Sequence, residues 1–188
     1  MVIKYDYGII KKIKDKINYI MATFNTHTFI KHDDYTTPFE AWNNIKEYIP
    51  RNKNIWCPFY CDGNQKTDFQ KLGFDIIHEE EDFFENDKGD VIIDNPPFSK
   101  KKEVFTRLKQ LGKPFIMICP SSMINTQYIR QLFKDGDDKL QIIIPKGRIH
   151  FIKKVDGVVP DDFNSCCNFD CFYYCWKMNL SRDIIWLD

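Results

Sequence analysis

The residues of this sequence best placed to do chemistry are Asn95-Pro96-Pro97-Phe98. They follow the apolar run Val91–Asp94, so the pattern predicts a buried strand that ends in two prolines and an aromatic ring. Proline fixes its own φ and has no N–H donor, so the turn should be rigid and rich in hydrogen-bond acceptors. Prolines also simply end strands, but that interpretation leaves the neighbouring Asn95 and Phe98 unexplained.

Such a turn suits an amine whose lone pair is delocalised into an aromatic base. If the Asn95 side-chain oxygen and the Pro96 carbonyl accept the two N–H bonds, the nitrogen becomes more tetrahedral and its lone pair leaves the ring plane. The nitrogen could then attack a methyl group on a sulfonium, a transfer that depends more on positioning than on a strong base. Phe98 is predicted to stack on the base, which must leave any duplex to enter the pocket.

The tetrapeptide resembles the (Asp/Asn)-Pro-Pro-(Tyr/Phe) signature of amino-methyltransferases that act on adenine N6, cytosine N4 or glutamine N5. Phe98 in the last place resembles the adenine enzymes, because the protein-glutamine enzymes usually carry Tyr. The resemblance implies catalytic roles for all four residues, a class I methyltransferase fold and S-adenosylmethionine as the cofactor. It covers roughly residues 35 to 152.

Two further segments stand in the order that this family has. Tyr35-Thr36-Thr37-Pro38 resembles the family's Tyr-x-Thr-Pro cofactor segment, and Ile55–Gly63 resembles its acidic-Pro-Phe-x-Gly-x-Gly strand and loop. Acids after the next strand would bind ribose and adenine, although the run 79–82 could equally be a solvated acidic turn. The implied cofactor-binding residues are Tyr35, Thr36, Thr37, Pro38, Pro58, Phe59, Asp62, Gly63, Glu79 and Asp82, with Phe83 or Phe84 beside Asp82.

The loop departs from the family pattern at two cysteines. Cys57 stands where an acidic residue often contacts the cofactor, and Cys61 stands where a glycine would allow close backbone approach. Asp62 could supply the displaced carboxylate. These departures concern cofactor affinity, and they leave open an inactive relative or one that needs a partner subunit.

Basic and aromatic residues supply candidates for binding the substrate. The lysines after the turn begin a predicted helix, where phosphates could bind, and Lys146–Phe151 resembles the family's late hairpin beside the target base. A solvated helix and an ordinary hairpin explain these residues equally well. The candidate substrate-binding residues are Phe98, Lys100, Lys101, Arg148, His150 and Phe151.

Strands and helices are predicted to alternate through most of the chain. This pattern indicates an α/β fold, a Rossmann-like doubly wound sheet that is mostly parallel, with an antiparallel C-terminal strand pair closing its edge. We expect one domain over 1–188, with 1–34 as a helical segment packed on it. Helices are predicted over 9–22, 39–48, 67–72 and 101–111, the last capped by Ser99, and strands over 54–59, 74–78, 91–94, 115–119, 140–145 and 165–177.

Composition narrows the class of protein. The 188 residues are 43% hydrophobic with no apolar run near the roughly 20 residues that span a bilayer, which predicts a soluble protein. The seven unevenly spaced cysteines do not suggest a disulfide framework, so we expect reduced thiols and an intracellular location, cytoplasmic or nuclear. The zero formal charge argues against strong, sequence-independent phosphate binding. Four late cysteines could suggest a metal site: Cys166, Cys167, Cys171 and Cys175. A strand would separate Cys167 from Cys175 by about 26 Å, too far for one ion to bridge them. We therefore expect no metal and interpret the four residues as buried thiols.

The leading hypothesis is therefore an S-adenosylmethionine-dependent methyltransferase of adenine N6, with DNA or RNA as substrate and possibly a second subunit or homodimer for target recognition. A glutamine-N5 protein methyltransferase is the alternative within the same chemistry. A catalytically inactive methyltransferase fold that scaffolds a partner is the alternative from another class.

Overall fold

The computed structural model describes residues 35–153 and 169–188. Internal contacts divide the chain into two compact units, Met1–Asp33 and Asp34–Asp188, and the described residues all belong to the second. The helix predicted over 9–22 lies outside the described residues. So do Cys166 and Cys167.

The second unit is built on a seven-stranded, mostly parallel sheet in the order β3-β2-β4-β5-β8-β6-β9. Every neighbouring pair is parallel except the two that involve β8. A separate antiparallel pair joins β1 to β7. The strands are β1 (Tyr35–Thr36), β2 (Ile55–Trp56), β3 (Ile76–Ile77), β4 (Val91–Asp94), β5 (Phe115–Pro120), β6 (Leu140–Ile144), β7 (Ile152–Lys153), β8 (Cys171–Trp176) and β9 (Ile184–Trp186).

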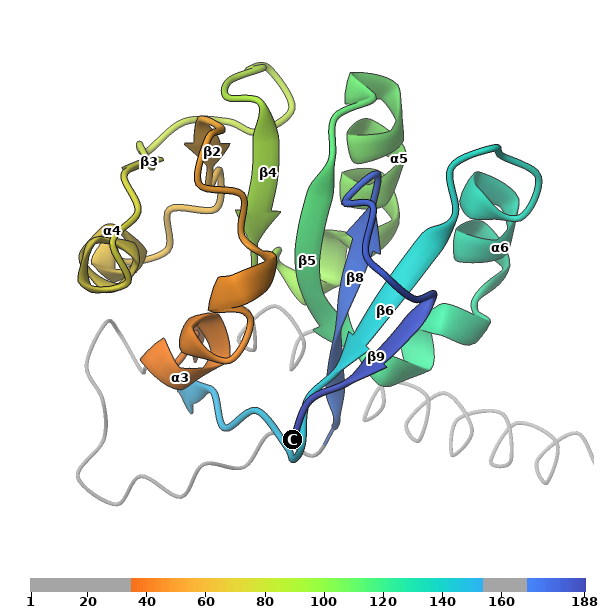
Figure 1. The fold of residues 1–188 in the computed structure, drawn as a ribbon. Coiled ribbons are helices and arrows are strands. Elements are labelled where there is room, and N and C mark those ends of the chain that lie inside the picture. The colour runs from red at the N-terminus through yellow and green to blue at the C-terminus, as the bar shows by residue number, and fades with distance from the viewer. Residues whose placement is uncertain (1–34, 154–168) are drawn as a thin grey trace, which may run out of the picture. The chain divides into compact units, whose positions relative to one another are not determined.

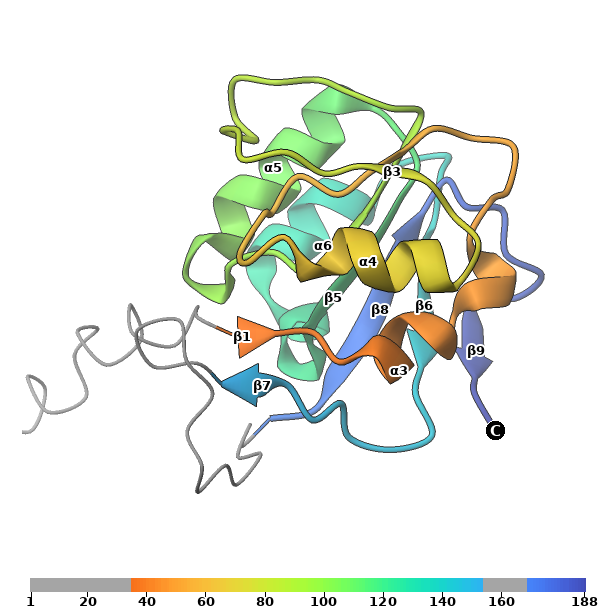
Figure 2. The ribbon, with the colours of Figure 1, turned by 90° about the vertical axis from the view of Figure 1, so that its left-hand side faces the viewer.

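Helices cover both faces of the sheet (Figures 1 and 2). Residues of α3 and α4 pack with Val91 and Ile93 on one face of the sheet, and residues of α5 and α6 pack with Ile92 on the other. The two faces alternate because successive side chains of a strand point in opposite directions. The helices are α3 (Phe39–Asn43), α4 (Asn64–Lys71), α5 (Lys101–Leu111) and α6 (Gln127–Phe133), with 3-10 turns η1 (Lys46–Tyr48), η2 (Phe98–Lys100) and η3 (Ser121–Asn125).

The mixed α/β architecture agrees with the prediction, and so do the bounds of β4 and α5. Helix α5 ends at Gly112, which has the left-handed φ of 68° that its position demands. The predicted cap is wrong: Ser99 lies in η2, the N-cap is Lys100, and no side chain caps the helix. The two prolines lead first into the 3-10 turn, which displaces Ser99 from the cap position.

Elements near the first strand differ more from the predictions. The helix predicted over 39–48 breaks into α3 and η1 at Ile45, whose φ of −109° is not helical. Strand β2 is short because Pro58, which has no N–H, follows soon after it. Helix α4 begins at Asn64 instead of Thr67, since Asp62 accepts a bond from the Asn64 backbone at 3.0 Å.

The predicted antiparallel C-terminal pair exists as β6 and β8, with Leu140 opposite Trp176 and Ile143 opposite Tyr173. It does not close the edge of the sheet. Strand β8 lies between β5 and β6, and the edge strand is β9, which the sequence analysis did not predict. The two described late cysteines, Cys171 and Cys175, are buried in β8, as expected of strand thiols. Within the described ranges, no helix has the length and apolar character needed to cross a membrane.

Candidate active site

A pocket lies where β2 and β4 end, and three of the predicted segments meet there. The space between its lining atoms is about 320 Å³, a figure that includes open solvent. We call it the strand-end pocket. Its lining residues are Tyr35, Thr36, Thr37, Trp42, Phe59, Tyr60, Cys61, Asp62, Gln65 and Asn95.

Asn95 enters this pocket directly from the end of β4. Its backbone N–H donates to the Asp94 carboxylate at 2.8 Å. Its side-chain oxygen Oδ1 is buried and has no hydrogen-bond partner among the residues that the structure describes. A buried amide oxygen without a partner is costly, on the order of 1–3 kcal/mol, so such atoms in a pocket point to a donor supplied by a ligand.

Asp94 joins the turn of β4 to the loop after β2. Its Oδ2 accepts the Phe59 N–H at 2.7 Å, and the residue is only 1% exposed. Burial raises its pKa from 3.8 to about 7, while the bonds from the Phe59 and Asn95 N–H groups and from Gln65 oppose the rise. Asp94 therefore connects the turn at Asn95 to Phe59, and both of these residues line the pocket.

A second carboxylate, that of Asp62, holds the segment after β2 in place. Asp62 Oδ2 accepts the Thr36 hydroxyl at 2.8 Å, which ties the 35–37 segment to this loop. Cys61 has a left-handed φ of 48°, and Gly63 has a φ of 73°. A Cβ on Gly63 would lie 2.8 Å from the Tyr60 Oη, so this position has no room for a larger residue while Tyr60 stays in place.

Phe98 and Phe151 come together beside the pocket in an aromatic cluster. The ring of Phe98 makes edge contacts with Phe151 at 6.1 Å and with Phe169 at 5.4 Å between centroids. Pairing of β1 with β7, Thr36 opposite Ile152, brings the late segment to this place. Phe151 is 1% exposed and packs in the core, so Phe98 offers the more accessible ring.

The basic candidates are exposed or partly buried residues. Lys101 donates to the Phe98 carbonyl at 2.7 Å, and its ammonium lies 5.8 Å from the centre of the Phe98 ring. Lys100 and His150 are exposed, and exposed Arg148 bonds Asp170 at 2.9 Å. None of these four residues lines the strand-end pocket, and Lys101 is the one with a described contact to Phe98.

Other predicted cofactor residues lie outside the lining of the pocket. Exposed Glu79 pairs with Lys88 at 2.6 Å, which lowers the pKa of Glu79, and Asp82 accepts the Phe84 N–H at 2.8 Å. Phe83 is buried against Phe59. Pro38 is the N-cap of α3, Gly63 is the N-cap of α4, and Pro58 is buried. Of the two prolines predicted to be catalytic, Pro96 is buried and Pro97 is the N-cap of η2.

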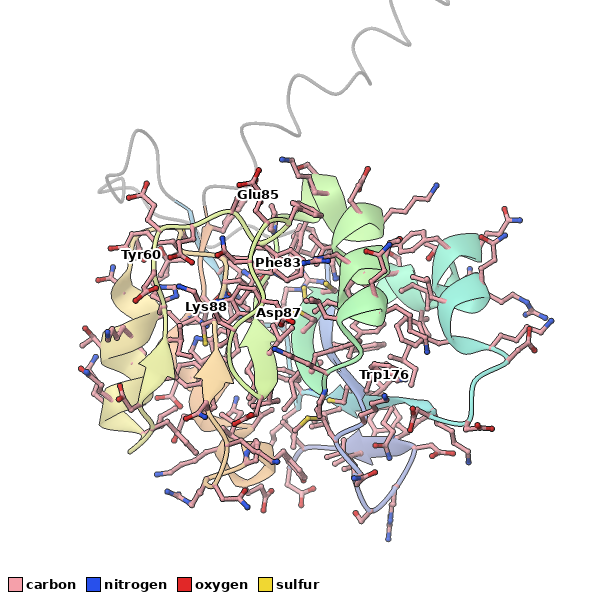
Figure 3. All side chains as sticks on the ribbon, turned by 90° about the horizontal axis from the view of Figure 1, so that it is seen from above. Tyr60, Phe83, Glu85, Asp87, Lys88 and Trp176 are labelled. Atoms are coloured by element: carbon pink, nitrogen blue, oxygen red, sulfur yellow. The ribbon has the colours of Figure 1, made fainter. Side chains whose placement is uncertain are left out.

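Figure 3 shows this part of the molecule from above. Tyr60, Phe83 and Lys88 gather around the segment that follows β3, and Trp176 lies apart from them. Lys88 bridges Glu79 and Glu81, so this acidic segment carries its own counter-charge. The carboxylates of Glu79 and Glu81 are therefore already paired with Lys88 within the protein.

No protein-family model matches the chain. No curated protein matches its sequence either.

Sequence reasoning missed four residues of the site: Asp94, Gln65, Trp42 and Tyr60. Gln65 lies on α4, and its amide approaches the Ile93 carbonyl at 3.5 Å. Tyr60 stacks on the buried His78 with centroids 5.1 Å apart, and His78 bonds the Cys57 carbonyl at 2.7 Å. Asp94 could have been found, since an acid that ends an otherwise apolar strand is unusual. Trp42 and Gln65 reach the pocket only through tertiary packing, whereas Tyr60 lies within the segment Ile55–Gly63 that the sequence already indicated.

Proposed function

We propose that this protein is an S-adenosylmethionine-dependent methyltransferase that acts on the N6 amine of adenine in DNA or RNA. The observation that carries the proposal is made at Asn95, which lines the strand-end pocket and whose buried side-chain oxygen lacks a partner among the described residues. Asn95 ends a strand at the carboxyl edge of a mostly parallel sheet, which is where ligands bind in open α/β folds.

The chemistry of the lining supports a cationic cofactor over a phosphorylated one. None of the ten lining residues is Lys, Arg or His, one is Asp62, and four are aromatic. Aromatic rings and a carboxylate favour a sulfonium, whereas a nucleotide phosphate needs cationic groups or N–H donors. When bound, S-adenosylmethionine would supply a methyl group on such a sulfonium. Asp62, Tyr35 and Phe59 are the residues that we expect to hold it.

The protein's own residues would prepare the amine. Asn95 Oδ1 would accept one N–H bond and the Pro96 carbonyl the other, which makes the nitrogen more tetrahedral. Asp94 would keep the turn in register with the Phe59 backbone through its 2.7 Å bond. Phe98 would stack on the base, and Lys101 fixes the carbonyl of Phe98. The antiparallel strand β8 within a parallel sheet further supports the class I methyltransferase fold.

Calorimetric titration and an activity assay on Asn95→Ala test the proposal. We expect the variant to bind S-adenosylmethionine within about threefold of wild type and to lose at least about a hundredfold in methyl transfer, because the amide acts on the target amine. Asn43→Ala is the matched control, since Asn43 is exposed and bonds only Glu40 among the described residues. Equal turnover of Asn95→Ala and wild type would contradict the mechanism.

The substrate is tested with labelled S-adenosylmethionine and separate pools of DNA, RNA and protein. Label in N6-methyladenine after digestion would support the proposal, and label in glutamine would favour the protein-methylating alternative. Two observations favour the inactive, scaffolding alternative: the left-handed φ of Cys61 and the ion pair between Glu79 and Lys88. That alternative requires both an absence of label in all pools and an absence of cofactor binding.

A further inference from the structure

Strand β9 (Ile184–Trp186) leaves one edge of the sheet open. It pairs with β6 on one side, and it is the last strand in the order, so no described strand covers its other side (Figure 1). Two large apolar side chains of this strand are exposed, Ile184 at 52% and Trp186 at 72%. They are two residues apart and therefore lie on the same face of the strand. Exposed apolar edges of this kind mark pairing sites.

The direction of the backbone groups follows from the bonds to β6. The Asp183 carbonyl accepts the Ile142 N–H, and the Leu187 N–H donates to the Ile144 carbonyl, both at 2.9 Å. Backbone groups alternate in direction along a strand, so the odd-numbered residues bond β6. The N–H and C=O groups of Ile184 and Trp186 point to the open edge.

We propose that a second copy of this chain pairs with β9 by antiparallel edge addition. With the two-fold axis at Ile185, Ile184 of one copy stands opposite Trp186 of the other, and each pair exchanges two N–H···O bonds. If the same register continued two residues beyond each end of β9, it would bring Arg182 of one copy near Asp188 of the other, and opposite charges would meet at both ends. Both of these side chains are exposed. An isologous interface requires this self-complementarity, and the sequence of the edge supplies it.

Sedimentation velocity tests the pairing through the outward hydrogen-bond donor. We expect a weak dimer, with a Kd on the order of 10–100 µM, because three-residue edges bury little area. Ile184→Pro removes an N–H that bonds nothing in β6 and should weaken the dimer at least tenfold. Ile184→Val keeps that donor and is the control. A monomer at all concentrations up to about ten times that Kd, or a dimer unaffected by Ile184→Pro, would overturn the proposal.

A charge swap tests the register even if Ile184→Pro fails to fold. Arg182→Asp should weaken association severalfold, and Arg182→Asp combined with Asp188→Arg should restore it. Trp186 gives a second readout, since the other three tryptophans are at most 3% exposed. Acrylamide quenching should therefore fall as the concentration rises. No restoration by the double variant would exclude this register.

Discussion

The backbone of Cys61 has a conformation that residues other than glycine rarely adopt. Its φ is 48°, and the family that the sequence resembles has a glycine at this place. A left-handed conformation costs an L-residue with a Cβ roughly 1–2 kcal/mol, and more when the side chain is β-branched. Nearby Gly63 also has a positive φ, so the loop makes two such turns in three residues.

We predict that Cys61→Gly will leave the protein at least as stable as wild type, whereas Cys61→Val will destabilise it. The free energies of unfolding of the two variants should differ by about 1–2 kcal/mol. Urea denaturation measures this difference directly. The two substitutions serve as each other's control, because both remove the weak contact of the thiol with the Tyr35 carbonyl. A more stable Val variant would argue against strain in this loop.

Asp94 is the residue whose titration should dominate the pH dependence of stability. Its pKa is raised from 3.8 to about 7 in the folded state because it is buried. The folded state therefore holds the proton more tightly than the unfolded state does. The contribution of Asp94 to the free energy of unfolding is complete below about pH 4 and is lost as the pH rises through about 7. The loss is up to roughly 4 kcal/mol.

We predict that Asp94→Asn will remove this part of the pH dependence. The amide cannot ionise, so wild type should lose stability relative to the variant between about pH 4 and pH 7. Denaturation of both proteins at several pH values measures the difference. Asp135→Asn, at an exposed carboxyl, is the control and should leave the slope unchanged. A flat difference across this range would mean that Asp94 is ionised throughout it.

At the scale of elements, Gly89 controls how closely the segment before β4 approaches β2. Its φ is 62°, and a Cβ there would meet the Asn54 carbonyl at 2.7 Å and the Trp56 Cβ at 3.0 Å. Gly112 has a similar φ of 68°, but a Cβ on it would have no described atom within 4 Å. The two glycines therefore separate a steric clash from backbone strain alone.

We predict that Gly89→Ala will destabilise the protein more than Gly112→Ala does. Gly112→Ala should lose about 1 kcal/mol through its φ, whereas Gly89→Ala should lose at least about 2 kcal/mol, because the clash is with backbone and not with a flexible side chain. Comparison of the two urea midpoints at equal slopes measures the difference. Equal losses would show that the Asn54 segment can move away.

Strongly patterned elements could be predicted from the sequence, and weakly patterned ones could not. The apolar run of β4 and the apolar spacing of α5 gave correct bounds, and Gly112 marked the helix end. Helix α6 was missed because it has only seven residues and fully buries only two of them, Ile129 and Phe133. Strand β9 was missed because only the long-range pairing of Ile142 with Ile184 defines it.

The candidate site divides in the same way. Motifs identified Asn95, Thr36 and Asp62, which the structure brings to one pocket. They could not identify Trp42 or Gln65, whose side chains reach the pocket from neighbouring helices. Nor could the motifs show that Glu79 forms an ion pair with Lys88, because that pair depends on the fold of the segment 79–90.

At the scale of the whole molecule, strand β8 connects the two layers of helices. Tyr173 points to one face, where its hydroxyl donates to the Ala41 carbonyl of α3 at 2.7 Å. Tyr174 points to the other face, where its hydroxyl donates to the Pro120 carbonyl at 2.8 Å. Both rings are fully buried, and burial raises the pKa of both hydroxyls, so they stay neutral donors at physiological pH.

We predict that Tyr173→Phe and Tyr174→Phe will each lower the free energy of unfolding by about 1–3 kcal/mol, since each leaves a buried carbonyl without its donor. Because both layers share one sheet, each variant should still unfold in a single transition. Circular dichroism and tryptophan fluorescence should therefore give coincident urea curves. Phe172→Leu, a partly buried neighbour without a hydroxyl, is the control for packing changes in β8. Separate transitions in either Tyr variant would show that the layers fold independently, and the sheet would then be two structural units instead of one.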